Sequence, residues 1–109
     1  MKRKPRILIV DDEPGLVRLL VLLLTKQDRY EVRSIYDATQ ALAVAVEFQP
    51  DLILLDWVMP QMNGGDVAQQ IRADPRVSSA RILFHSAILS KQDQPGELAG
   101  CPAMPNQLV

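Results

Sequence analysis

Acidic side chains stand directly after two short apolar runs of this 109-residue chain. The first run, residues 7–10, ends at the pair Asp11-Asp12, and the second, residues 52–55, ends at Asp56. Carboxylates that meet in one place repel one another, so a cluster of three is costly unless a cation offsets it. Oxygen ligands of this kind suit Mg²⁺, which keeps several waters and takes further oxygens from phosphate groups. The residues therefore predict a magnesium site at which one carboxylate can act as a nucleophile toward a phosphoryl group.

The elements that would position these aspartates alternate between strand and helix. Residues 7–10 and 52–55 are continuous apolar runs, which are typical of strands covered on both faces. Residues 31–36 alternate polar and apolar side chains and predict a half-exposed strand, and residues 81–86 predict a fourth strand. Helices are expected from a first turn at Pro14 through residues 16–26, from a cap at Asp37 to about Phe48, and after a loop at residues 59–65.

This alternation predicts an α/β fold with βαβ units, right-handed crossovers and a doubly wound parallel sheet. Ligands of such sheets sit beyond the carboxyl ends of the strands, where the strand order reverses. Asp11, Asp12 and Asp56 all follow strand ends, so we expect them to converge on one edge of the sheet. If the aspartates only began a helix and a turn, each would be explained singly but their common placement would not.

Composition narrows the range of functions. A chain of this length forms one domain, and 48% apolar with 23% charged residues is ordinary for a globular protein. The net charge of -1 favours neither nucleic acid nor a membrane as a direct partner. No apolar run is long enough to span a bilayer or to form a signal sequence, and the single Cys101 excludes an internal disulfide. We therefore expect a cytoplasmic protein.

The residues around Asp56 resemble the receiver domains of two-component response regulators. The similarity reaches to about Gly100 and rests on Asp11-Asp12, Leu54-Leu55-Asp56-Trp57-Val58-Met59-Pro60-Gln61-Met62-Asn63-Gly64 and Ser86-Ala87. It implies a single receiver domain over residues 1–109, with a flavodoxin-like sheet of strand order 2-1-3-4-5. It also implies a phospho-acceptor signalling domain of a phosphorelay, phosphorylated by a sensor histidine kinase or phosphotransfer protein and acting through a downstream protein partner.

Carried over by position, the resemblance makes Asp56 the phospho-acceptor. Asp12 would be the main side-chain ligand of Mg²⁺ and Asp11 would bind chiefly through water. Asp56 and the backbone carbonyl of Val58 would complete the protein's ligands. On this reading the chain is not an enzyme beyond promoting its own phosphorylation and dephosphorylation, and it contacts neither nucleic acid nor a membrane directly.

The resemblance also covers the C-terminal part of the chain. The Ser86 hydroxyl and the backbone N–H of Ala87 would donate to phosphoryl oxygens. The family's lysine has no counterpart, since Met104 or Asn106 falls at its position. The fifth strand is weak and the last helix is missing, so we expect a domain truncated at its C-terminal end. A helix of this length cannot bury all the leucines of residues 16–24 on one narrow stripe. These leucines and the uncovered surface predict that the chain self-associates into a homo-oligomer or is a truncated form of a longer chain.

Other functions account for parts of the sequence. A pseudo-receiver, which binds a protein partner without being phosphorylated, would explain the absent lysine but not the intact acidic triad. An enzyme on the same fold, such as a flavin or nucleotide protein, would need a glycine-rich phosphate loop that this chain lacks. His85 invites a phosphotransfer role, but its place in a strand beside Phe84 favours a packed residue. The phospho-acceptor therefore ranks first.

Overall fold

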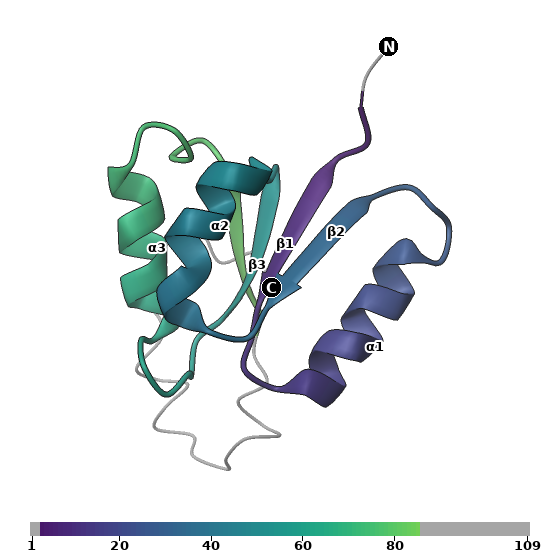
Figure 1. Ribbon diagram of the computed structural model, residues 1–109, viewed down its shortest axis with the longest axis horizontal. Helices are drawn as coiled ribbons and strands as arrows, with labels where there is room; N and C mark the ends of the chain where they lie inside the picture. The colour runs from purple at the N-terminus through teal and green to yellow at the C-terminus, as the bar shows by residue number, and fades with distance from the viewer. Residues whose placement is uncertain (1–2, 86–109) are drawn as a thin grey trace.

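The computed structural model describes residues 3–85, which form a parallel sheet with helices on both faces (Figure 1). The elements are β1 (Arg6–Val10), α1 (Pro14–Thr25), β2 (Glu31–Ile35), the 3-10 turn η1 (Ala38–Gln40), α2 (Ala41–Phe48), β3 (Leu52–Asp56), α3 (Gly64–Ala73) and β4 (Arg81–His85). The strands lie in the order β2-β1-β3-β4, as predicted for the first four. The weak fifth strand that the sequence predicts falls outside the described residues.

The first helix begins as predicted, whereas the second does not. α1 starts at Pro14, whose fixed φ suits the first turn of a helix. The second helix is divided, since the Asp37 side chain accepts a hydrogen bond from the Thr39 N–H at 2.9 Å and caps the short turn η1. α2 then starts at Ala41. This difference arises from a local capping bond, which the apolar pattern does not record.

The predicted loop before the third helix is shorter than expected. α3 begins at Gly64, and the side chain of Asn63 caps it by accepting from the Asp66 N–H at 2.9 Å. The sequence pattern assigns Asn63 and Gly64 to the loop because asparagine and glycine are common turn residues. In this chain they form the helix cap and the first helical residue, which brings the start of α3 close to the end of β3.

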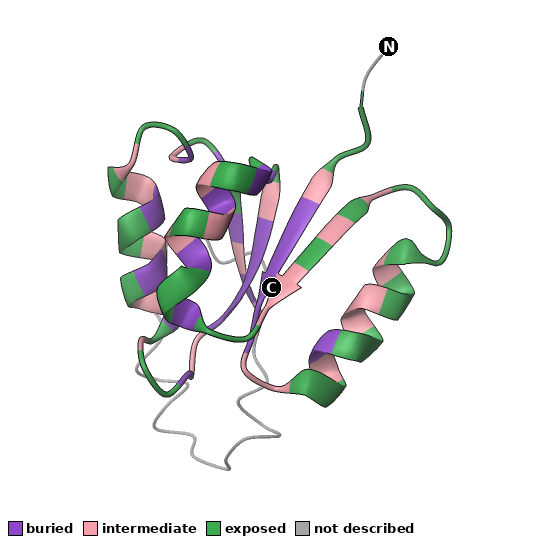
Figure 2. Ribbon diagram, in the orientation of Figure 1, coloured by how far each residue is buried: buried purple, intermediate pink, exposed green. Residues whose placement is uncertain are grey.

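The central strands β1 and β3 are buried on both faces (Figure 2). One face packs against α2 and α3, with a core that includes Leu8, Val10, Ile53, Leu55, Val67 and Ile71. The other face packs against α1 through a smaller core of Ile7, Ile9, Val17 and Leu54. β2 lies at the edge of the sheet and is half-exposed, as its alternating pattern predicts. The carboxyl ends of β1 and β3 are thus held together by two hydrophobic cores.

The helix α1 carries an exposed apolar surface. Leu19, Leu22 and Leu23 are 50%, 64% and 57% exposed, in agreement with the expectation that a helix of this length cannot bury all its leucines. We predict that the chain self-associates through these side chains at about tens of micromolar, where weak interfaces become populated. Sedimentation velocity would show a concentration-dependent shift that the double variant Leu22→Gln, Leu23→Gln loses. A wild-type chain that sediments as a monomer throughout this range contradicts the prediction.

No helix among residues 3–85 combines the length and apolar character needed to cross a bilayer.

Asp51, at the amino end of β3, ties the N-terminal segment to the sheet. Its carboxylate accepts from the Arg6 N–H at 2.8 Å and from the Arg3 guanidinium at 2.9 and 3.2 Å. The backbone bond from Arg6, followed by the bond from Arg3, lowers the pKa of Asp51 below its ordinary value. A carboxylate with a lowered pKa in the folded state stabilises that state above its unfolded pKa of about 3.9. This contribution is lost as the pH falls through the folded value.

We therefore predict that Asp51→Asn reduces the free energy of unfolding at neutral pH and that the difference narrows below about pH 4. The side chain is 47% exposed, so solvent screening limits the loss to about 1 kcal/mol or less. Urea unfolding at a series of pH values measures the difference. A gap between variant and wild type that widened toward acid would contradict the assignment.

Candidate metal centre

The carboxyl ends of β1 and β3 lie side by side, because the strands pair in parallel with Val10 opposite Leu55. Asp11 follows β1 directly and Asp56 is the last residue of β3, so the register places the two aspartates at the same level. The backbone N–H of Asp11 also donates to the carbonyl of Ile35 at 3.2 Å, which continues the pairing of β1 with β2 beyond the end of β1. The backbone at this edge is therefore fixed by the sheet itself.

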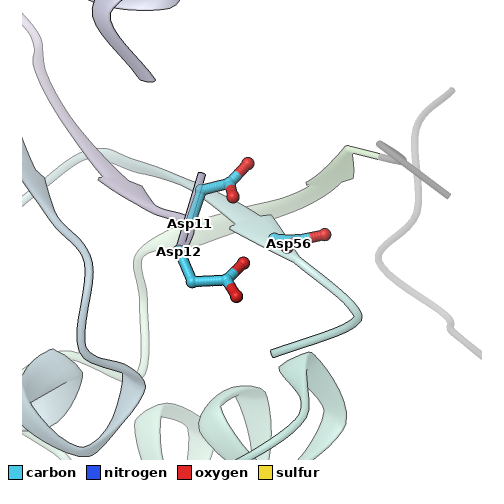
Figure 3. Close-up of side chains that lie close together, drawn as sticks. All are labelled: Asp11, Asp12 and Asp56. Atoms are coloured by element: carbon cyan, nitrogen blue, oxygen red, sulfur yellow. The ribbon is translucent and has the colours of Figure 1, made fainter. Parts of the chain in front are cut away.

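Three carboxylates meet at this edge of the sheet (Figure 3). Asp11, Asp12 and Asp56 each offer one oxygen, and these oxygens all lie within 4.8 Å of one another. The side chains of Asp11 and Asp56 are completely buried and Asp12 is half-buried. Buried carboxylates of like charge are unfavourable alone, and oxygen donors are the ligands that Mg²⁺ prefers. The structure thus brings together the three aspartates that the sequence singled out, in a donor set that fits this cation.

Backbone N–H groups orient two of the carboxylates. Oδ1 of Asp11 accepts from the N–H of Glu13 at 2.9 Å, and Oδ1 of Asp56 accepts from the N–H of Val58 at 3.4 Å. In both cases the donor lies two residues after the aspartate, which is the usual local bond of a short acidic side chain at a turn. Val58, whose carbonyl is a predicted metal ligand, is held beside Asp56 by this bond.

The segment after Asp56 returns to the end of β3. The N–H of Gly64 donates to the carbonyl of Trp57 at 2.8 Å. A Cβ atom on Gly64 would lie 2.5 Å from the carbonyl oxygen of Asp56, so only a residue without a side chain fits against this backbone. The Trp57 ring packs edge-on against Phe84, with ring centroids 5.4 Å apart. The close approach of Gly64 and the packing of Trp57 hold the loop that follows Asp56 against the ends of β3 and β4.

His85 lies beside the acidic cluster. It belongs to β4 and pairs in register with Asp56. Its side chain is 18% exposed, which agrees with the expectation of a packed strand residue, and Nε2 lies 3.3 Å from Oδ2 of Asp11. The strand pattern gave no sign of this second feature, because the contact joins residues of two strands that are not neighbours in the sheet.

Several predicted residues lie outside the described part of the chain. These are Ser86 and Ala87, the predicted donors to a phosphoryl group, and Met104 and Asn106, which stand at the position of the family's lysine. Their roles stay predictions.

Known proteins are similar to this chain over most of its length. The sequence pattern described as "Response regulator receiver domain" matches residues 7–97. The DNA-binding response regulator MtrA of Mycolicibacterium smegmatis is 43% identical over 110 residues, which cover 97% of this chain and 48% of that protein. The DNA-binding dual master transcriptional regulator RpaA of a Synechocystis species is 38% identical over 90 residues, covering 83% and 37%. The chain thus spans about half the length of these relatives or less.

A solved structure has the same arrangement of elements. The chemotaxis protein CheY4 of Vibrio cholerae superposes with a TM-score of 0.74 and 25% sequence identity, over 96% of this chain and 83% of that one. The parallel strand order and the helices on both faces therefore correspond to a flavodoxin-like fold.

Proposed function

Because the chain belongs to the response regulator receiver domain family, we propose that it accepts a phosphoryl group on Asp56 in a two-component phosphorelay. The observation that carries the proposal is the cluster of Asp11, Asp12 and Asp56, whose oxygens lie within 4.8 Å at the carboxyl edge of the sheet. A buried carboxylate surrounded by other carboxylates is a poor structural residue. It suits a site that binds a divalent cation and a phosphoryl group.

The side chains have distinct parts in this reaction. A carboxylate oxygen of Asp56 attacks the phosphorus of the donor and forms an acyl phosphate as the bond to the donor breaks. Asp12 would be the main direct ligand of Mg²⁺, Asp11 would act through water, and Asp56 and the carbonyl of Val58 would complete the set. Mg²⁺ held by these residues would supply positive charge to neutralise the phosphoryl oxygens. The Val58 N–H, which already donates to Asp56, keeps the nucleophile oriented.

The proposal extends to partners. The phosphoryl group comes from a sensor histidine kinase or phosphotransfer protein in the cytoplasm, and a downstream protein responds to the charge added at Asp56. MtrA and RpaA are named as DNA-binding proteins, and this chain matches about half of their length or less. For the segment present here we propose no direct contact with nucleic acid and no reaction other than its own phosphorylation and dephosphorylation. The complete acidic triad favours this role over the pseudo-receiver alternative, which has no need of three aspartates at one edge.

The proposal is tested by incubating the chain with Mg²⁺ and acetyl phosphate, a small acyl-phosphate donor, followed by intact mass spectrometry. We expect a single phosphoryl adduct that is absent when a chelator replaces Mg²⁺. A chain that remains unmodified under conditions that phosphorylate a known receiver would instead support the pseudo-receiver.

A further inference from the structure

Asp11, Asp56 and His85 occupy one row at the carboxyl edge of the sheet. The preceding row on the same face is apolar and consists of Ile9, Leu54 and Leu83, which are paired in register. Because side chains alternate along a strand, the residues two positions later face the same side. These are Asp11, Asp56 and His85, contributed by β1, β3 and β4. The topology thus places an imidazole in the same row as two of the three carboxylates.

The His85 ring reaches across the central strand of this row. β3 lies between β1 and β4, so the backbones of Asp11 and His85 are about two strand spacings, roughly 10 Å, apart. Nε2 of His85 nevertheless lies 3.3 Å from Oδ2 of Asp11. The contact spans the end of β3, where Asp56 stands, and the Asp11 side chain at one end of it is completely buried.

The carboxylate of Asp11 is therefore contacted on both oxygens. The N–H of Glu13 donates to Oδ1 at 2.9 Å, and His85 stands at Oδ2. Two partners on different oxygens restrict the rotation of a carboxylate as well as its position. A donor to a charged acceptor in a buried place is among the stronger hydrogen bonds of a protein. Asp11 thus has one oxygen held by a hydrogen bond from the backbone and the other at ion-pair distance from the His85 ring.

We propose that His85 is a positioning residue of the metal centre, whose Nε2–H donates to Oδ2 of Asp11 and holds this carboxylate in the orientation that Mg²⁺ binding requires. The inference rests on the proposed function. Mg²⁺ prefers oxygen ligands, so the imidazole acts on the carboxylate and is not itself a ligand. Either protonation state of the ring can carry the Nε2–H that the contact needs. Partners that orient a metal ligand in this way typically contribute 10- to 100-fold in metal affinity.

The test is a Mg²⁺ titration of the full chain, followed by the fluorescence of Trp57, its single tryptophan, which adjoins Asp56. His85→Leu removes the donor and is expected to raise the Mg²⁺ dissociation constant about 10- to 100-fold. His85→Gln carries an amide N–H at nearly the reach of Nε2 and is expected to restore most of the affinity. Arg76→Leu is the control, because it removes a basic partner from a carboxylate, Asp74, and leaves the acidic cluster untouched. It should bind Mg²⁺ as the wild type does.

A packing role would give a different pattern. Leucine would then bind Mg²⁺ like the wild type, or leucine and glutamine would weaken binding equally, and either result overturns the proposal. If the leucine variant does not fold, His85→Asn replaces it, because its amide is one methylene too short to reach Asp11 and should bind as weakly as leucine is expected to. Equal affinities of the asparagine and glutamine variants would overturn the proposal.

The same titration distinguishes a failure of the role proposed for His85 from a failure of the proposed function. Wild-type Mg²⁺ binding that Asp12→Asn abolishes and His85→Leu leaves unchanged would retain the metal centre and remove only the role of His85. A wild-type chain that does not bind Mg²⁺ would remove both.

Discussion

Replacing Asp56 by asparagine is expected to abolish phosphorylation completely. The amide has nearly the same shape as the carboxylate and can still accept from the Val58 N–H, so the local backbone has no reason to move. It has no anionic oxygen to attack phosphorus and cannot form an acyl phosphate. Intact mass after incubation with Mg²⁺ and acetyl phosphate measures the effect. The wild type should gain one phosphoryl group and Asp56→Asn none.

Asp66→Asn provides the matched control for this substitution. Asp66 is an exposed aspartate in the first turn of α3 and lies outside the acidic cluster. The control should be phosphorylated as the wild type is. An adduct that persists in Asp56→Asn would mean that another residue is the acceptor.

The same substitution should change how Mg²⁺ affects stability. Without metal, Asp56→Asn removes one charge from three carboxylates whose oxygens lie within 4.8 Å, so the variant should be at least as stable as the wild type. With Mg²⁺ at a hundredfold excess over its dissociation constant, the wild type gains about 2.7 kcal/mol of unfolding free energy. The variant has lost a ligand and gains less. Thermal unfolding with and without Mg²⁺ separates these effects, and an equal gain in both proteins would exclude Asp56 from the metal centre.

The second large effect is expected at Gly64. An alanine Cβ here would lie 2.5 Å from the carbonyl oxygen of Asp56 and 3.0 Å from the Cα of Trp57. Both are backbone atoms at the end of a central strand, so they cannot move aside as a flexible side chain would. The start of α3 must shift instead, with loss or distortion of the 2.8 Å bond from the Gly64 N–H to the Trp57 carbonyl. We expect Gly64→Ala to cost about 1–3 kcal/mol of unfolding free energy, the range for overpacked sites.

The displacement should also slow the phosphorylation of Asp56, because it acts on the backbone of the acceptor itself. A shift of this kind near reacting groups can reduce the rate about 100-fold. Urea unfolding and the rate of phosphorylation measure the two effects. Gly15→Ala is the control, since a Cβ at this position in the first turn of α1 would meet nothing within 4 Å. Alanine there should leave phosphorylation unchanged and stabilise the helix by up to about 1 kcal/mol. Equal costs at the two glycines would contradict the steric argument.

Much of the fold could be predicted from the pattern of apolar residues. The continuous runs at residues 7–10 and 52–55 indicated buried central strands, and β1 and β3 occupy these places in the sheet. The alternation at residues 31–36 indicated an edge strand, which is where β2 lies. These predictions hold because the apolar pattern of a strand reflects which of its faces are buried in the fold. The division of the second helix at Ala41 and the early start of α3 at Gly64 could not be obtained this way, since they depend on capping bonds of single side chains.

The sequence by itself identified the three carboxylates and the edge of the sheet at which they would meet. Asp11, Asp12 and Asp56 follow apolar runs, and parallel strands put all their carboxyl ends at one edge of the sheet. Only the tertiary structure decided what surrounds them. The contact of His85 with Asp11 crosses an intervening strand, and the close approach of Gly64 to Asp56 depends on how a loop returns to the strand it left. Periodicity specifies which face a residue occupies, whereas contacts between residues far apart in the chain depend on register and packing in three dimensions.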